Sequence, residues 1–134
     1  MRKNRILIGV LGLDQHEVGA IGIARLLRDA GMEVIYIGKF NLPENIVQTS
    51  MQEDVDLIGL SCHSWEYLHY IPELLGIIKE KQLGTPVIVG GSVITPGDGQ
   101  EVISQGVAAV YGPNATNEEI IKGINSIIGE TESS

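Results

Sequence analysis

The sequence predicts a single α/β domain, in which helices cover both faces of a doubly wound, five-stranded parallel sheet. Short apolar runs alternate with helical segments five times along the 134 residues, and such alternation is typical of parallel sheets. The first run, from Ile6 to Leu11, is apolar throughout, as expected of a strand buried on both faces. A chain of this length buries most of its apolar surface without disulfides, and its one cysteine offers none.

The first half of the chain divides at its glycines and prolines. Gly31 is suited to the position after a helix, and Pro43 to the first turn of the next one. Gly19 and Gly22 weaken the start of the first helix, so we expect it to order fully only when a ligand covers it. Pro72 implies a kink in the third helix or a start later than Trp65. The elements expected here are strands over 5–11, 33–37 and 56–61 and helices over 18–30, 43–53 and 65–82.

The second half continues the alternation. Strands are expected over 86–90 and 108–111, and helices over 98–105 and 117–128. The last helix carries an apolar stripe at helical spacing, made of Ile120, Ile121, Ile124, Ile127 and Ile128. Residues 130–134 are expected to be a flexible tail after a core over about 5–129. Right-handed crossovers give the strand order 2-1-3-4-5, a flavodoxin-like (Rossmann-like) topology.

Charge excludes two classes of partner. The formal net charge is -8, whereas nucleic acid and anionic membranes require basic patches. The basic residues at positions 1–5 are interpreted as a solvated terminus, because the apolar run after them is too short for a signal peptide. No apolar stretch reaches the length of a membrane span. We therefore expect a cytoplasmic protein with no nucleic-acid or membrane partner.

In this topology, polar and glycine residues meet at the carboxyl edge of the sheet. The crevice lies between strands 1 and 3, where the strand order reverses. A phosphoacceptor receiver would need an Asp ending strand 3 and a Lys ending strand 5, but Ser61 and Gly112 stand there. The acidic first loop is unsuited to the phosphate of FMN, and no GxGxxG follows strand 1. The residues concerned are Asp14, Gln15, His16, Glu17, Val18, Gly19, Ser61, Cys62, His63, Gly90, Gly91, Ser92 and Gly112.

A metal held by one imidazole explains this edge better. Asp14 is close enough in sequence to His16 to accept a hydrogen bond from the second ring nitrogen, which is how histidine ligands are usually oriented. One protein ligand is too few for zinc or non-haem iron but suits a macrocycle, which fills the equatorial positions itself. The Gly90-Gly91 pair would let a bulky group approach the backbone. On this interpretation, Gly91→Val weakens ligand binding without unfolding the domain.

These residues resemble the cobalamin-binding domains and small subunits of adenosylcobalamin-dependent mutases. The family pattern Asp-x-His-x-x-Gly, Ser-x-Leu, Gly-Gly appears as Asp14 to Gly19, Ser61 to His63 and Gly90-Gly91. His63 replaces the Leu of the pattern. Residues 27–36 and 52–56 look like the acyl-CoA mutase branch, which includes methylmalonyl-CoA mutase, whereas residues 9–12 and 16–19 look more like the glutamate mutase small subunit.

The resemblance implies a cofactor, a ligand and a partner. Adenosylcobalamin (vitamin B12) would bind with its benzimidazole displaced, His16 would be the lower cobalt ligand, and the nucleotide tail would pass Ser61 and Gly90-Gly91. The chain would be the small subunit of an acyl-CoA mutase of the methylmalonyl-, isobutyryl- or hydroxyisobutyryl-CoA type, inactive alone. A large subunit with a substrate-binding barrel would bind the acyl-CoA.

Several alternatives remain open at this point. The chain could serve a glutamate mutase, carry methyl groups on a corrinoid, or store cobalamin. Cys62 is interpreted as a small buried residue, and His63 as lining the corrin pocket or a partner interface. Trp65, Tyr67 and Tyr70 could cover the cofactor, contact a partner or pack within the domain.

Overall fold

A parallel five-stranded sheet in the order β2-β1-β3-β4-β5 forms the centre of the protein, and this confirms the predicted topology. The computed structural model describes residues 4–12, 18–62, 65–91, 94–112 and 114–133. Within these ranges the chain alternates strictly between strand and helix. The elements are β1 (Arg5–Val10), α1 (Val18–Asp29), β2 (Glu33–Tyr36), α2 (Pro43–Gln52), β3 (Leu57–Ser61), α3 (Tyr67–Glu80), β4 (Val87–Gly90), α4 (Pro96–Gln105), β5 (Ala109–Tyr111) and α5 (Asn117–Ser133).

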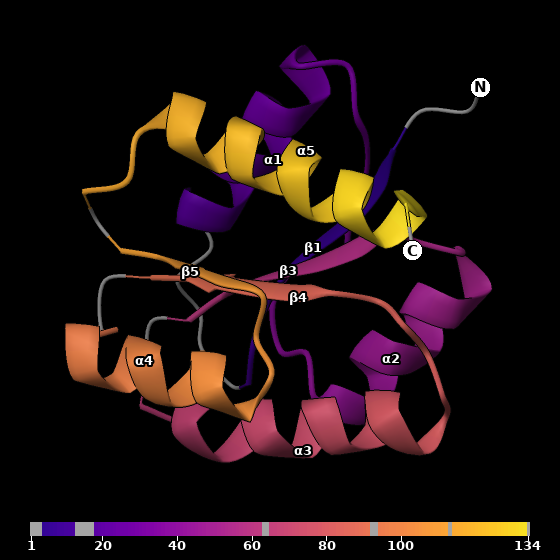
Figure 1. Cartoon of the computed structure of the whole chain (residues 1–134), viewed down its shortest axis with the longest axis vertical. Coiled ribbons are helices and arrows are strands. Elements are labelled where there is room, and N and C mark those ends of the chain that lie inside the picture. Colours follow the sequence, from indigo (N-terminus) through magenta and orange to yellow (C-terminus); the bar gives the residue numbers. More distant parts are fainter. Residues whose placement is uncertain (1–3, 13–17, 63–64, 92–93, 113, 134) are drawn as a thin grey trace.

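The helices form two layers of unequal size. Helices α1 and α5 lie over one face of the sheet, and α2, α3 and α4 cover the other (Figure 1). Each face has its own core, because alternate residues of a strand point to opposite sides. Ile6, Ile8 and Ile88 pack toward α1 and α5. Leu7, Ile58, Leu60 and Val89 pack toward the other three helices.

Most predicted boundaries lie within two residues of the observed ones. Helix α3 begins at Tyr67, so the later start rather than residue 65 is correct, and Pro72 lies inside the helix. Helix α4 begins two residues earlier than predicted. Thr95 caps it by accepting a hydrogen bond from the Asp98 amide at 3.1 Å, and Pro96 occupies the first turn. Helix α5 continues to Ser133, five residues past the predicted end. No helix in the described ranges is long and apolar enough to cross a membrane.

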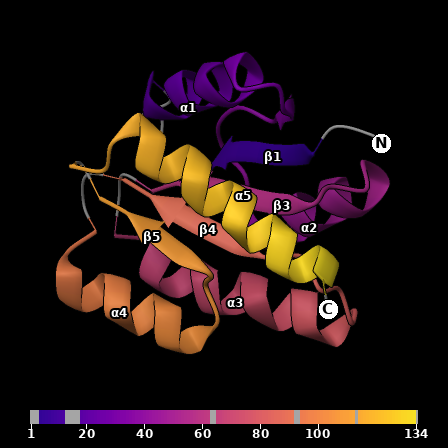
Figure 2. The ribbon, with the colours of Figure 1, turned by 45° about the horizontal axis from the view of Figure 1, so that its top comes forward.

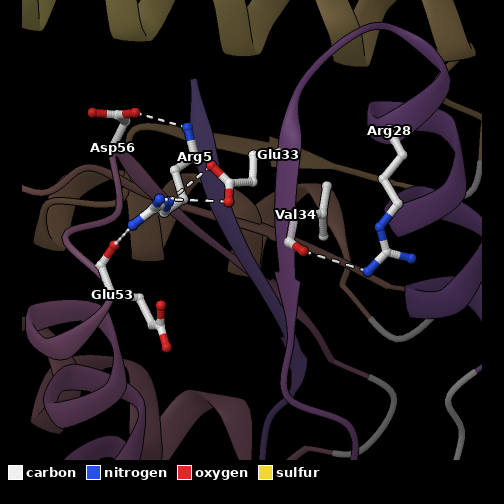
Figure 3. A network of polar contacts seen from close by, with 6 residues as sticks. All are labelled: Arg5, Arg28, Glu33, Val34, Glu53 and Asp56. Atoms are coloured by element: carbon white, nitrogen blue, oxygen red, sulfur yellow. Dashed lines mark hydrogen bonds and ion pairs between the residues drawn. The ribbon is translucent and has the colours of Figure 1, made fainter. Parts of the chain in front are cut away.

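A polar network closes the amino edge of the sheet (Figure 3). The Arg5 guanidinium donates to the Glu33 carboxylate at 3.1 Å and to the Glu53 carbonyl at 2.5 Å. The Arg5 amide donates to Asp56 at 2.7 Å. Arg5 belongs to β1, as predicted, and its side chain is bonded to its neighbours, which corrects the interpretation of Arg5 as part of a solvated terminus. These bonds lie at the opposite end of the strands from the crevice.

Tyr67 connects the first turns of α3 and α4. Its side chain is buried, and its hydroxyl lies 3.3 Å from Asp98 Oδ2. Burial, and then the charge of Asp98, raises the pKa of Tyr67 to about 12. The folded state therefore favours the neutral phenol, whose ordinary pKa is about 10. This contribution to stability is complete below about pH 10 and is lost as the pH rises through about 12.

We expect Tyr67→Phe to remove this alkaline loss of stability. The free energy of unfolding of the wild type, measured in urea, should fall between about pH 10 and about pH 12 more steeply than that of the variant, because only the wild type ionises the buried Tyr67 phenol, while Tyr111 is the same in both. Tyr70→Phe, on the same helix, is the control and should keep the wild-type slope. Equal slopes for the wild type and Tyr67→Phe would contradict the assignment.

Candidate functional site

The strand register aligns the predicted site residues across the carboxyl edge of the sheet. Val10 pairs with Ser61, Ser61 with Gly90, and Gly90 with Tyr111. The row crosses the point between β1 and β3 where the strand order reverses, which is where open α/β sheets bind ligands. Ser61 and Gly90 point to the same face of the sheet as Ile88, because each lies an even number of positions from a residue of that face. The structure therefore brings Ser61 and Gly90 together, as predicted.

A groove of about 150 Å³ descends from this row between α1 and α5. The two helices lie apart over β1, β3 and β4 (Figure 2). The lining is almost entirely apolar: isoleucine side chains form the walls, and Ser61 lies at its rim. Glycine backbone of β3 and β4 forms part of the floor. The residues of the lining are Ile8, Gly19, Ala20, Ile23, Gly59, Leu60, Ser61, Ile88, Val89, Gly90, Gly91, Tyr111 and Ile120.

Gly91 is required by the protein's own backbone. A Cβ atom at this position would overlap the carbonyl oxygen of Cys62, and the φ angle of Gly91 is 156°. The neighbouring amide of Cys62 donates to the Gly90 carbonyl at 2.7 Å, so the two strand ends are held together here. The expectation that Gly91→Val would leave the fold intact is therefore wrong. Gly90 has slightly more room, since its Cβ would lie 3.1 Å from the Tyr111 carbonyl oxygen.

Other predicted residues lie at different places along the edge. Cys62 is 1% exposed and packs in the core beneath α3, which confirms the interpretation as a small buried residue. Val18, at the start of α1, is 86% exposed, whereas Gly19 lines the groove. Gly112 lies outside the groove, in a separate hollow between the ends of α4 and α5. Asp14, Gln15, His16, Glu17, His63 and Ser92 fall outside the described residues.

The groove also contains residues that were not predicted as site residues. Tyr111 forms its end at β5, and a Cβ on Gly123 of α5 would overlap the Tyr111 hydroxyl. Burial, and then the charge of Glu119, raises the pKa of Tyr111. Ile120 belongs to the apolar stripe that was visible in the sequence of the last helix. The missing information was which strand residues this stripe faces.

Residues 4–122 match the family model described as the B12 binding domain. This match covers most of the chain. The protein belongs to the B12-binding domain family. Its membership agrees with the groove and the row of strand ends, both of which lie within the matched residues.

Two relatives match this B12-binding domain over most of both chains. The 2-hydroxyisobutanoyl-CoA mutase small subunit of Aquincola tertiaricarbonis is 36% identical over 92% of this chain and 91% of its own length. The pivalyl-CoA mutase small subunit of Xanthobacter autotrophicus is 33% identical over 94% and 84%. Methylmalonyl-CoA mutase of Escherichia coli is 33% identical over 96% of this chain, but this chain spans only 18% of it.

Solved structures confirm the fold. A cobalamin-binding protein from Desulfitobacterium hafniense superposes with a TM-score of 0.76 and 22% identity, over 90% of this chain and 58% of that one. The receiver domain of the response regulator NarL from Mycobacterium tuberculosis reaches 0.74 with 19% identity, over 96% and 98%. The fold is thus shared between domains of different function, and function has to be argued from the site.

The groove residues fit the cofactor of the family. The nucleotide tail of cobalamin ends in a flat, largely apolar aromatic base, and the groove offers an apolar slot between two helices. Gly90 carries no side chain at the end of β4, so a ring can approach the backbone there, whereas the Ile8 and Ile88 side chains occupy the space over Gly59. The Ser61 hydroxyl at the rim is suited to a hydrogen bond with a polar group of the tail.

Proposed function

We propose that the chain is the cobalamin-binding small subunit of a cytoplasmic acyl-CoA mutase and binds adenosylcobalamin without its benzimidazole on the metal. The groove between α1 and α5 is the observation that carries this proposal. A displaced base needs an apolar place beside the sheet, and the groove provides one next to Ser61 and Gly90. The likeness to two acyl-CoA mutase small subunits over most of both chains supports the choice of enzyme class.

In this proposal, His16 is the lower ligand of cobalt. It follows Gly12 by four residues, Gly12 itself lies two residues past the end of β1, and the groove opens at this edge of the sheet. Asp14 accepts a hydrogen bond from the other ring nitrogen, which fixes the tautomer and raises the basicity of the ligand. Bound adenosylcobalamin supplies radical chemistry by homolysis of its cobalt–carbon bond. The chain itself binds and orients the cofactor.

A larger subunit completes the enzyme by covering the cofactor and binding the acyl-CoA in a barrel. Large apolar side chains are exposed beside the carboxyl edge, where such a subunit would meet the cofactor. Phe40 and Trp65 are 51% and 57% exposed. They follow β2 and β3. Val18 and Leu68 are exposed in helices that begin at the same edge, and Leu42 is exposed directly before α2. The small subunit alone is accordingly expected to be inactive.

Electron paramagnetic resonance of the cobalt(II) cofactor bound to the chain tests this binding mode. Labelling histidine with nitrogen-15 should change the axial hyperfine splitting of the wild type, because the ligand nitrogen comes from the protein. His16→Ala should abolish that change and weaken binding at least about tenfold, since one ligand bond is lost while the groove remains.

His69→Ala is the matched control, because His69 lies on the surface of α3 and should not affect the spectrum. An axial nitrogen that stays unlabelled in the wild type would show that the cofactor keeps its own base on cobalt. That result would refute the proposed binding mode.

A further inference from the structure

The loop between β2 and α2 contains a buried amide side chain, Asn41. It is 4% exposed. Its Nδ2 donates to the Gly38 carbonyl at 2.7 Å and to the Val10 carbonyl at 3.2 Å. Its Oδ1 accepts from Asn45 Nδ2 at 3.0 Å. Both ends of the amide are thus bonded, which is the condition under which a polar side chain is stable in a protein interior.

Hydrogen bonds from the loop that contains Asn41 take over where the backbone pairing of β1 with β2 ends. The last pair in that ladder is Ile8 with Tyr36. Beyond it, Val10 donates to the Gly38 carbonyl at 2.9 Å, and Gly12 donates to the Asn41 carbonyl at 2.7 Å. On the other side, the Leu11 amide donates to the Ser61 carbonyl at 3.1 Å. The end of β1 is therefore held between β3 and the loop that contains Asn41.

The backbone conformation, hydrogen bonds and close contacts of the loop hold Asn41 in this position. Its neighbour Phe40 has a φ of 63°, an unfavourable conformation for a bulky residue that persists only where the surroundings impose it. After Asn41, the Leu42 amide donates to Asn45 Oδ1 at 2.6 Å. On β1, a Cβ at Gly9 would lie 2.6 Å from an Ile37 carbon and 3.2 Å from Asn41 Nδ2. The loop and the strand are thus in close contact.

We infer that Asn41 is a positioning residue for the cobalt ligand. Gly12 is the last described residue before the segment that carries His16, so the place where Gly12 is held is the place from which that segment starts. By bonding Val10 through its side chain and Gly12 through its backbone, Asn41 determines that starting point. This inference rests on the proposed function, because it requires His16 to bind cobalt.

Two variants and one matched control test it. Asn41→Ala removes the amide. Asn41→Asp keeps its shape but directs a carboxylate oxygen at the carbonyls of Val10 and Gly38, which repel it. Ser50→Ala removes the hydrogen bond of another buried polar side chain, Ser50 Oγ to the Val47 carbonyl at 2.7 Å in α2, away from the end of β1. Each variant removes hydrogen bonds of a buried polar side chain and lowers stability, so a loss of stability alone does not test the inference.

The readouts are the histidine-derived hyperfine splitting of bound cobalt(II) cobalamin and the hydrogen exchange of the Gly12 amide in the free protein. In both Asn41 variants we expect the ratio of histidine-bound to histidine-free cobalt to fall about tenfold, which corresponds to about 1.4 kcal/mol. Exchange at Gly12 should accelerate by a similar factor, because its acceptor is no longer held in place. Ser50→Ala should keep the wild-type splitting and the wild-type exchange at Gly12.

The result that would overturn the inference is full histidine splitting and unchanged Gly12 exchange in Asn41→Asp, with only the melting temperature lowered. Asn41→Asp and the exchange measurement keep the test decisive if Asn41→Ala fails to fold. A wild type without histidine-derived splitting would instead refute the proposed function, and the role of Asn41 with it. The two failures are therefore distinguishable.

Discussion

Gly91→Ala is expected to destabilise the domain by about 3 kcal/mol or more, the range in which a backbone clash in a packed region falls. The added Cβ would overlap the Cys62 carbonyl oxygen, and Gly91 already has a positive φ that disfavours any side chain. Relief requires the ends of β3 and β4 to separate, which breaks the hydrogen bond from the Cys62 amide to the Gly90 carbonyl. The measurement is chemical unfolding without cofactor.

Gly112→Ala is the matched control at the same edge of the sheet. Its Cβ would have no neighbour within 4 Å, and its φ is not positive. This variant should unfold at nearly the wild-type denaturant concentration. A Gly91→Ala protein as stable as the Gly112→Ala protein would show that the contact with Cys62 is easily relaxed, and Gly91 would then be free to act through the ligand alone.

Ser61→Leu is expected to weaken cobalamin binding about a hundredfold, equivalent to about 2.7 kcal/mol. Ser61 lines the groove at the centre of the row of strand ends, so a larger side chain there would occupy space that the nucleotide tail requires in the proposed binding mode. The hydroxyl is lost at the same time. Because the groove is open toward the edge, the leucine can be accommodated, and the free protein should remain folded.

A corrinoid without the nucleotide tail separates a blocked groove from general damage. Its affinity should be nearly the same for Ser61→Leu and the wild type, whereas the affinity of complete cobalamin should differ. Ser104→Leu, a change of the same size on the exposed surface of α4, should bind both compounds normally. An equal loss of affinity for both compounds in Ser61→Leu would contradict placement of the tail in the groove.

The sequence predicted the sheet well because the residues that mark each strand and helix lie within a few positions of one another. The apolar run before Gly12 and the prolines and glycines at helix ends located the elements, and right-handed crossovers then allowed only a few strand orders. The errors were local as well. Helix α4 begins at Pro96 after the Thr95 cap, two residues before the predicted start, and Arg5 bonds with Glu33 and Glu53 instead of lying free in a solvated terminus.

The candidate site was predicted less completely than the fold. The strand ends at Ser61 and Gly90 were found because the carboxyl ends of parallel strands share one edge. The walls of the groove were missed, because Ile23, Tyr111 and Ile120 come from three different elements. Tyr111 faces α5 only because β5 packs against that helix. A short stretch of sequence does not reveal this packing.

By itself, the sequence determined the alternation of strands and helices, the parallel order of the sheet and the pattern of residues at its carboxyl edge. Only the tertiary structure decided that Gly91 is needed by Cys62, that an apolar groove opens between α1 and α5, and that Asn41 holds the end of β1. The physical reason is the separation along the sequence over which each kind of interaction acts. Periodicity and helix capping act between near neighbours, whereas the bond from Asn41 to Val10 joins residues 31 positions apart and exists only when the strands are in register.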